Sequence, residues 1–366
     1  MRVAIVGCGQ LSRMLALAGL PLGIQFSFIA EAGEPTVCVD GLGAIVVWQP
    51  GDDIALLYQQ LGQPNCVTIE KEQVDIALLE SLSQYCSVYP SLKAIRNCQH
   101  RHLEKQLLEQ LNIPCANYVY LQSGSAAPAQ NNLANLSPPL IAKSCQEGYD
   151  GKNQRALNNS NDIDHFICSN TNEWIIEEKI LFHKEISQIS VRSINGDIGH
   201  YPLTENIHSD GILHQSIAPA TAIPQQLQTQ AQDDITRLMN ELNYVGVMAM
   251  ECFVVNDQLL INELAPRVHN SGHWTQLGSV TCQFENHLRA ITGLTLGSTT
   301  QHKVAGMINL LGTAAPPLSK LSEHSTVQWY NKAIKPCRKQ GHVNFIGESH
   351  HNLQQQMAAF KNSNVV

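Results

Sequence analysis

The first hundred residues alternate short apolar runs with stretches whose apolar positions recur at helical spacing. The runs predict strands and the periodic stretches predict helices. Such alternation is typical of a parallel sheet covered by helices. We therefore expect a Rossmann-like parallel α/β domain over residues 1–97, with strands at Val3–Val6, Phe26–Ile29, Ala44–Trp48 and Cys66–Ile69 and helices at Leu11–Ala18, Asp53–Leu61 and Val74–Gln84.

The later sequence mixes the two patterns in an α+β order. A helix at His100–Leu111 should end before the proline at position 114, and a polar loop is predicted at Ser123–Pro139. Short strands around a glycine-containing loop are expected from Leu140 to Ile180. The pattern then predicts strands at Glu185–Asn195 and His200–Leu203, a helix at Gln225–Asn243, a hairpin of Tyr244–Val255 with Gln258–Leu264, a helix at Cys282–Thr292, and a small β-rich module from about Thr299.

Composition narrows the class of protein. The chain has 366 residues and a formal net charge of −8, so its surface does not favour nucleic acid or anionic lipid. No apolar run approaches the roughly 18 residues that a membrane span needs, and none resembles a secretory signal. No two of the 11 cysteines lie closer than twelve positions, which argues against zinc or disulfide spacing. We expect a cytoplasmic protein that binds neither nucleic acid nor membrane.

A glycine turn follows the first predicted strand. Residues 7–12, Gly-Cys-Gly-Gln-Leu-Ser, form a partial G-x-G-x-x-G pattern with serine in the third glycine position. Amides at the start of the next helix can hold an anion, and Glu31 stands about twenty residues on, where dinucleotide-binding proteins place an acid. Three interpretations stay open: a dinucleotide site, contact with another anion or substrate, and a plain turn.

A second glycine-containing loop lies at residues 147–154, Glu-Gly-Tyr-Asp-Gly-Lys-Asn-Gln, shortly after Lys143. A lysine at a strand end beside a turn with exposed amides suits a triphosphate. The spacing is not that of a P-loop. An ordinary hairpin turn with exposed lysines is the alternative.

The predicted hairpin gives the strongest physical argument. A turn centred on Asp257 places Glu251 directly opposite Glu263, so their carboxylates share one face of an antiparallel pair. Two carboxylates so close repel unless a cation lies between them, and oxygen ligands beside phosphate are the usual setting of Mg²⁺. Two alternatives stay open: each glutamate pairs with a base such as Arg267, or a one-residue register shift separates them.

Donor-rich segments follow the hairpin. Residues 264–275 contain an arginine, two histidines, an asparagine and a serine, a set that suits an oxyanion or phosphoryl site. The planar fork of Arg267 matches phosphate oxygens. Near the C-terminus a basic cluster predicts either a site for one small phosphorylated substrate or a solvated turn; it consists of Lys332, Lys335, Arg338 and Lys339.

Together these segments resemble the ATP-grasp superfamily, and most closely its family of 5-(carboxyamino)imidazole ribonucleotide synthases of bacterial purine biosynthesis. The resemblance covers nearly the whole chain and fades only at residues 123–139 and after about Gly347. Its most specific stretch is Asn262–Thr275. The other matching stretches are Gly9–Met14, Gly148–Gly151, Tyr201–Thr204, His208–Leu213 and Tyr244–Phe253.

The resemblance implies an ATP-grasp carbon–nitrogen ligase that carboxylates 5-aminoimidazole ribonucleotide with bicarbonate. The reaction would pass through carboxyphosphate and release ADP and phosphate. ATP and Mg²⁺ are the implied cofactors, and a homodimer is the implied assembly. The implied domains are a pre-ATP-grasp domain at 1–97, a small lid domain at 98–180, a large ATP-grasp domain at 181–298 and a C-terminal module at 299–366. The competing interpretations are another ATP-grasp ligase, a nicotinamide-dependent oxidoreductase, and a nucleotide-binding protein without catalysis.

The family pattern also implies roles for particular residues. Glu251 and Glu263 would bind the metal ion, Arg267 would stabilise the transferring phosphoryl group, and Asn270 would lie at the reacting groups. ATP would contact Arg101, Lys143, Gly148, Tyr149, Asp150, Gly151, Lys152, Asn153, Gln154, Glu177, Glu178, Lys179, Ile180, Glu185, His208, Asn262 and Glu263. The ribonucleotide would contact Gly9, Gln10, Asn270, Ser271, His273, Lys335, Arg338 and Lys339.

Two positions of the phosphate loop depart from the family pattern, which has glycine at both. Asn153 should be harmless, because asparagine tolerates positive φ. Glu147 places a carboxylate near the triphosphate and is expected to weaken ATP binding.

Overall fold

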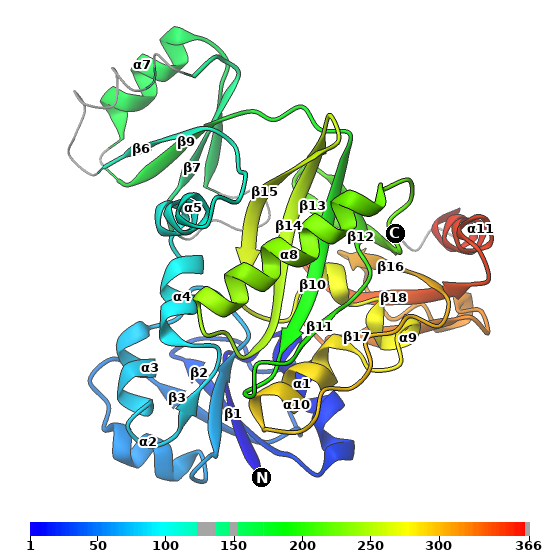
Figure 1. The fold of residues 1–366 in the computed structure, drawn as a ribbon. Coiled ribbons are helices and arrows are strands. Elements are labelled where there is room, and N and C mark those ends of the chain that lie inside the picture. Colours follow the sequence, from blue (N-terminus) through cyan, green and yellow to red (C-terminus); the bar gives the residue numbers. More distant parts are fainter. Residues whose placement is uncertain (123–132, 134–135, 147–152, 171, 363–366) are drawn as a thin grey trace.

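The computed structural model describes residues 1–122, 133, 136–146, 153–170 and 172–362 (Figure 1). Its N-terminal part is a five-stranded sheet in the order β3-β2-β1-β4-β5, and every pair is parallel, as predicted. Alternate residues of the central strand enter two different cores, so both faces of this sheet are buried. The elements are β1 (Arg2–Val6), α1 (Gln10–Gly19), β2 (Gln25–Glu31), β3 (Ala44–Trp48), α2 (Ile54–Gln60), β4 (Cys66–Ile69), α3 (Ile76–Leu82), β5 (Ser87–Val88) and α4 (Leu92–Cys98).

A small antiparallel sheet projects from the body of the molecule at the upper left of Figure 1, in the order β6-β9-β7-β8. Helix α7 packs against it through Phe166, whose ring meets Trp174 edge-on with centroids 5.0 Å apart. The elements are α5 (Arg101–Gln110), β6 (Tyr118–Leu121), β7 (Leu140–Ser144), β8 (Gln154–Leu157), α7 (Ser160–Ser169) and β9 (Trp174–Glu178).

A nine-stranded sheet forms the centre of the molecule, in the order β15-β14-β10-β12-β13-β16-β18-β17, with β11 paired to β10. Strand β13 pairs with β16, so the expected boundary at residue 298 divides the chain but not the sheet. Helix α8 covers one face, and its apolar side chains share a core with β14. The elements are β10 (Lys184–Arg192), β11 (Ile198–His200), β12 (Thr204–Ser209), β13 (Ile212–Ala218), α8 (Gln225–Glu241), β14 (Gly246–Val255), β15 (Gln258–Ala265), the short helix η2 (Asn270–Gly272), α9 (Thr275–Gly278), α10 (Gln283–Ile291), β16 (Val304–Leu311), β17 (Ser325–Trp329), β18 (Lys339–Gly347) and α11 (His350–Phe360).

The strand predicted at His200–Leu203 is wrong. Strand β11 ends at His200 and β12 begins at Thr204. The residues between them, Tyr201 and Leu203, are buried in the two cores on either side. Their apolar pattern therefore reports burial, not strand pairing. In the part of the chain that the structure describes, no helix has the length and apolar character of a membrane span.

One buried histidine joins the N-terminal sheet to the central one. On α10, His287 is fully buried; its Nε2 lies 2.8 Å from Thr68 Oγ1 on β4, and its Nδ1 accepts the Val247 N–H of β14 at 3.0 Å. Gly246 has φ +118°, and a Cβ there would lie 2.8 Å from the ring, so glycine permits this approach. Burial lowers the pKa of His287 to about 4. The fold therefore holds the ring neutral.

We predict that His287 makes the free energy of unfolding depend on pH. Its folded pKa is depressed, so its contribution is intact above the ordinary value of 6.5 and is lost as pH falls toward 4. The loss over that window is about 3 kcal/mol. Urea unfolding at a series of pH values measures it by comparing the parent with His287→Gln, which does not titrate. Equal pH slopes in the two proteins would contradict the prediction.

Candidate active site

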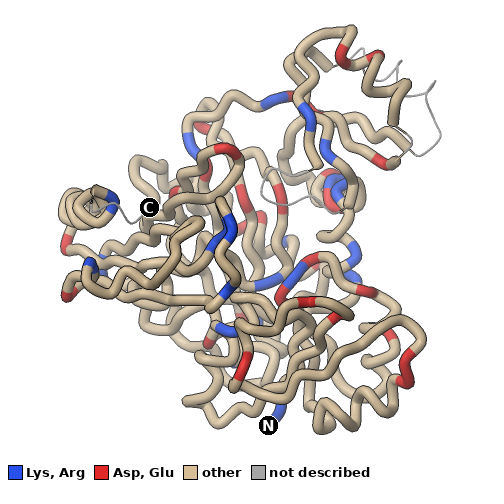
Figure 2. The backbone as a smooth tube through the Cα atoms, turned by 180° about the vertical axis from the view of Figure 1, so that it is seen from behind, with Lys and Arg blue, Asp and Glu red and all other residues tan. Residues whose placement is uncertain are grey.

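A cleft of about 580 Å³ lies between the small sheet and the central one. Its walls come from β7 and β8 on one side and from β10, β12, β14 and β15 on the other. Figure 2, seen from behind, marks acidic positions on strands at the centre of the molecule and basic positions on segments beside them. The predicted site residues that line the cleft are Arg101, Lys143, Gln154, Glu185, His208, Glu251, Asn262, Glu263, Asn270 and Lys339. The remaining positions of the predicted phosphate loop lie outside the described residues: Glu147, Gly148, Tyr149, Asp150, Gly151 and Lys152.

A β-bulge brings the two central carboxylates together. The β14–β15 hairpin turns at Asn256 and Asp257, whose φ angles of 47° and 57° are typical of a type I′ turn. The register that this turn sets would place Asn262 opposite Glu251. A bulge at Asn262 moves the register by one residue, and Glu251 pairs with Glu263 instead. The predicted pairing is confirmed, but it arises from a bulge and not from a turn centred on one residue.

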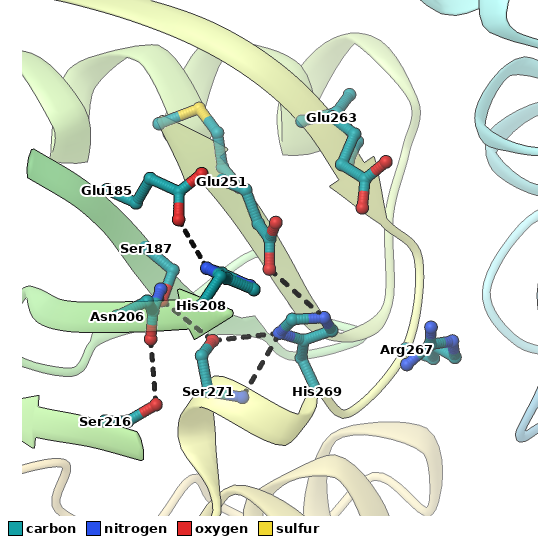
Figure 3. Close-up of polar contacts among 12 residues, drawn as sticks. Glu185, Ser187, Asn206, His208, Ser216, Glu251, Glu263, Arg267, His269 and Ser271 are labelled. Carbon is teal, nitrogen blue, oxygen red and sulfur yellow. Dashed lines mark hydrogen bonds and ion pairs between the residues drawn. The ribbon is translucent and has the colours of Figure 1, made fainter. Parts of the chain in front are cut away.

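Glu251 and Glu263 extend from neighbouring strands and both line the cleft (Figure 3). Burial, followed by the charge of Glu263, raises the pKa of Glu251 to about 8. Glu251 Oε1 lies 3.4 Å from His269 Nε2, and Glu263 Oε2 lies 3.5 Å from Arg101 Nη1. Burial lowers the pKa of His269 well below its usual value, so this ring is neutral. Of these two neighbours, Arg101 is the one that carries a full charge.

Arg267, the base considered as an alternative partner for this pair, is engaged elsewhere. Its Nη2 pairs with Glu72 Oε1 at 2.7 Å, and its Nη1 donates to the Val268 carbonyl at 3.0 Å. Burial raises the pKa of Glu72 although Arg267 opposes the shift. The guanidinium is thus anchored by a carboxylate from the N-terminal domain, a partner that the sequence did not reveal.

The carboxylate pair fits a cation that brings phosphate ligands with it. Glu251 and Glu263 supply hard oxygen donors beside the amide of Asn262, and Mg²⁺ commonly combines one or two carboxylates with waters and substrate phosphates. Within the described ranges, no group of three or more His, Cys, Asp or Glu side chains is placed to hold a metal ion. The residues present therefore fit a shared site better than one built wholly from protein ligands.

Two lysines converge on one buried carboxylate. Lys143 of β7 forms an ion pair with Glu177 of β9 and donates to Asn262 Oδ1 at 3.2 Å. Lys105 Nζ lies 3.2 Å from the other oxygen of Glu177, and its side chain is only 2% exposed. Burial alone would raise the pKa of Glu177, but the two lysines lower it. Glu177 is thus a buried anion with two cations, one of which reaches the cleft.

Lys105 belongs to a charged face of α5 that ties the sheets together. On the same face, Arg101 approaches Glu263, and Glu104 accepts the Leu264 N–H at 3.0 Å. Burial, followed by the charge of Glu263, raises the pKa of Glu104 to about 8. Glu104 and Lys105 were not predicted as site residues. Their positions, three and four residues after Arg101, could have indicated that they belong to the site, because such positions share one helix face.

The first glycine turn binds an anion that belongs to the chain itself. The carboxylate of Glu70 accepts the backbone N–H groups of Gly9 at 2.6 Å, Leu11 at 3.1 Å and Ser12 at 3.0 Å. A Cβ on Gly9 would lie 2.4 Å from this carboxylate, so the turn requires glycine. Glu70 stands where a dinucleotide would place its pyrophosphate. The dinucleotide interpretation is wrong.

The C-terminal basic cluster meets this turn. Lys332 donates to the side chain of Gln10, and burial lowers the pKa of that lysine. Lys339, at the start of β18, lines the cleft. Arg338 donates to the Ala333 carbonyl at 3.3 Å, and its own N–H bonds the Lys335 carbonyl at 3.2 Å. The cluster is therefore a folded turn with Lys339 on its cleft side.

The segment after β15 divides into a cleft side and a core side. Asn270 lines the cleft, and both polar atoms of its side chain are buried without a hydrogen-bond partner among the described residues. His273 is 1% exposed, hydrogen-bonds Gln283 at 3.3 Å and packs its ring 4.5 Å from that of His342. The geometry supports a ligand-binding role for Asn270. It places His273 in the core, so substrate contact by this histidine is not supported.

Residues 177–180, which the resemblance assigns to ATP, begin in β9 and continue past its end at Glu178. The carboxylate of Glu178 accepts a hydrogen bond from Asn117 Nδ2 at 3.0 Å. The backbone N–H of Lys179, the residue before Ile180, donates to the Pro139 carbonyl at 3.0 Å. Asn153 has φ 55°, the left-handed conformation that asparagine tolerates.

Glu185 and His208 form a hydrogen-bonded pair on the cleft wall. Burial opposes protonation of His208, but the hydrogen bond to Glu185 and the negative charges of Glu251 and Glu185 together outweigh burial and raise the pKa of His208.

Two sheets that enclose a charged cleft, joined to a parallel N-terminal sheet, define an ATP-grasp protein. Family models match in the same order: a ribonucleotide synthetase preATP-grasp domain at 1–99, an ATP-grasp domain at 106–284, and a phosphoribosylaminoimidazole carboxylase C-terminal domain at 305–356.

Similar proteins cover the chain from end to end. The N5-carboxyaminoimidazole ribonucleotide synthase of Vibrio cholerae is 39% identical over 98% of this chain and 94% of its own. That of Pseudomonas aeruginosa is 38% identical over 98% of both chains. The crystal structure of the Thermus thermophilus synthetase superposes with a TM-score of 0.90 at 36% identity, over 98% of both chains. The chain belongs to the N5-carboxyaminoimidazole ribonucleotide synthase family, which confirms the resemblance found in its sequence.

We predict that Lys105→Met weakens ATP binding about tenfold, measured by calorimetry with the full chain. Without Lys105, Lys143 is left as the lysine paired with buried Glu177 among the described residues and is less free to turn toward phosphate. Lys105→Arg keeps the charge and should retain most of the affinity. If Lys105→Met folds and binds ATP like the parent, Lys105 has no part in nucleotide binding.

Proposed function

We propose that the chain catalyses the ATP-dependent carboxylation of 5-aminoimidazole ribonucleotide with bicarbonate, in purine biosynthesis. The observation that carries the proposal is the bulge-enforced opposition of Glu251 and Glu263 in a cleft that also presents Lys143 and Arg101. A solved relative from Aspergillus clavatus, 27% identical with a TM-score of 0.87, is described in complex with ADP and 5-aminoimidazole ribonucleotide.

In this proposal Glu251 and Glu263 hold Mg²⁺ together with ATP. When bound, the ion supplies a positive charge that offsets the charge on the transferring phosphoryl group. Lys143 leaves Glu177 for the phosphates, while Lys105 keeps that carboxylate neutralised. Arg267 adds a second fixed positive charge that stabilises the transferring group.

The ribonucleotide side of the site would be built where the N- and C-terminal domains meet. Gln10 and Lys332 already join the first glycine turn to the basic cluster, and Lys339 faces the cleft. Lys335, Arg338 and Lys339 would hold the ribonucleotide phosphate, as the family pattern implies. The same pattern supports a cytoplasmic homodimer.

We predict that 5-aminoimidazole ribonucleotide stimulates ADP release from ATP in the presence of Mg²⁺ and bicarbonate. Glu263→Gln should reduce the stimulated rate by about a hundredfold or more, because it removes one charge from the carboxylate pair. The matched control is Glu241→Gln. Glu241 is the last residue of α8 and forms an exposed ion pair with Lys93, so this variant should keep the parent rate.

Other outcomes of this assay separate the alternatives. ATP binding without stimulation by the ribonucleotide would favour another ATP-grasp substrate. ATP binding without ADP release under any condition would favour a protein that binds nucleotide without catalysis.

A further inference from the structure

A chain of buried polar side chains runs from the middle of the central sheet to the carboxylate pair (Figure 3). It begins at Ser216 on β13, crosses Asn206 on β12 and Ser187 on β10, and reaches Ser271 in η2. Ser187, Ser216 and Ser271 are fully buried and Asn206 is 6% exposed. The proposed reaction assigns Ser271 to the ribonucleotide and gives no direct role to Ser187 or Ser216. Burying so many polar groups is costly unless each is paired.

The hydrogen bonds of this chain all point the same way. Ser216 Oγ donates to Asn206 Oδ1 at 2.8 Å, and Asn206 Nδ2 donates to Ser187 Oγ at 3.1 Å. The Ser187 hydroxyl, having accepted there, donates to Ser271 Oγ at 2.7 Å. The hydrogen of Ser271 is then left for His269 Nδ1, 2.8 Å away. The orientation of one amide thus sets the direction of every later bond.

A backbone group approaches the same ring nitrogen at a longer distance than the Ser271 hydroxyl does. The Ser271 N–H donates to His269 Nδ1 at 3.3 Å, and an N–H is a donor only. This longer contact favours the tautomer that the polar chain selects, in which Nδ1 accepts and the proton lies on Nε2. Gln283 holds the backbone: its Oε1 accepts the His269 N–H at 3.0 Å and its Nε2 donates to the His269 carbonyl at 2.6 Å. Position and tautomer are both determined.

From these contacts we infer that Ser187, Asn206 and Ser216 are positioning residues that hold His269 as a neutral Nε2–H donor to Glu251. Nε2 lies 3.4 Å from Glu251 Oε1. One oxygen of this carboxylate is then directed at the histidine, and the other would be available to a cation. The opposite tautomer would point a lone pair at the carboxylate and push it away. Hydrogen bonds to ligating groups commonly orient metal sites in this way.

The inference rests on the proposed function only where it concerns the cation. The tautomer is a property of the ligand-free chain and can be tested without catalysis. The decisive variant is Asn206→Asp, because a carboxylate cannot donate to Ser187. Ser187 must then donate to residue 206, Ser271 to Ser187, and His269 Nδ1–H to Ser271. One isosteric change reverses the chain.

The first measurement is ¹⁵N NMR of the histidine rings in the full chain without ligands. The His269 signals are assigned by their loss in His269→Gln. We expect a protonated Nε2 in the parent and a protonated Nδ1 in Asn206→Asp. If Asn206→Asp does not fold, Ser187→Ala serves, and a mixture of the two tautomers is expected. The matched control is Ser190→Ala on the same strand, which removes a buried hydroxyl 2.8 Å from His200 Nδ1 and should leave His269 unchanged.

The second measurement is the Mg²⁺ dependence of ADP release. Asn206→Asp and Ser187→Ala should raise the half-saturating Mg²⁺ concentration about tenfold. This is the low end of the effects that follow when residues that orient metal ligands are changed. Ser187→Thr, which keeps the hydroxyl, should have the half-saturating Mg²⁺ concentration of the parent, and so should Ser190→Ala.

A protonated Nδ1 in the parent, or the same tautomer in all variants, would overturn the inference. So would an unchanged Mg²⁺ dependence in variants whose tautomer has changed. If the parent releases no ADP, the proposed function fails, while the NMR result still decides the tautomer.

Discussion

The repulsion between Glu251 and Glu263 is the constraint on which the rest of this site depends. The hairpin places them face to face, and burial makes the second negative charge costly. Everything packed around the pair lessens that cost without removing it. Arg101 approaches one carboxylate at 3.5 Å and the neutral ring of His269 approaches the other at 3.4 Å. The two carboxylates are therefore held in place, but their negative charge is only partly offset. A cation that binds such a pair gains the most favourable electrostatic interaction.

The same logic recurs at three other carboxylates among the described residues. Glu70 is satisfied by three backbone amides, Glu72 by Arg267, and Glu177 by two lysines. The Glu72–Arg267 pair links the N-terminal domain to the central sheet, and Lys143 links the small sheet to the central one through Asn262, so the domains are joined through groups that also shape the site. The cost of leaving such groups unpaired explains why they are held so firmly. A ligand that binds the cleft meets a preorganised set of charges.

The sequence predicted much of this and missed the rest for physical reasons. The parallel strands follow from local periodicity, and the hairpin arithmetic predicted the glutamate pair, although from a turn centred on one residue. The bulge at Asn262 could not be predicted, because a pattern of apolar and polar positions does not indicate where an extra residue interrupts strand pairing. Glu70 and Lys105 act through partners about sixty or more positions away. Their roles depend on which segments the fold brings together. His273 shows the converse error, since a donor-rich motif also contains residues that build the core.

The most direct measurement is a titration of Mn²⁺ binding in the presence of a non-hydrolysable ATP analogue. Binding is monitored by the loss of the electron paramagnetic resonance signal of the free ion. If the opposed carboxylates hold the cation, Glu251→Gln and Glu263→Gln should each weaken Mn²⁺ binding about tenfold or more. The double variant should add little to either single change, because the two groups act as one site. Mn²⁺ affinity equal to that of the parent in both single variants, with the analogue still bound, would contradict the account.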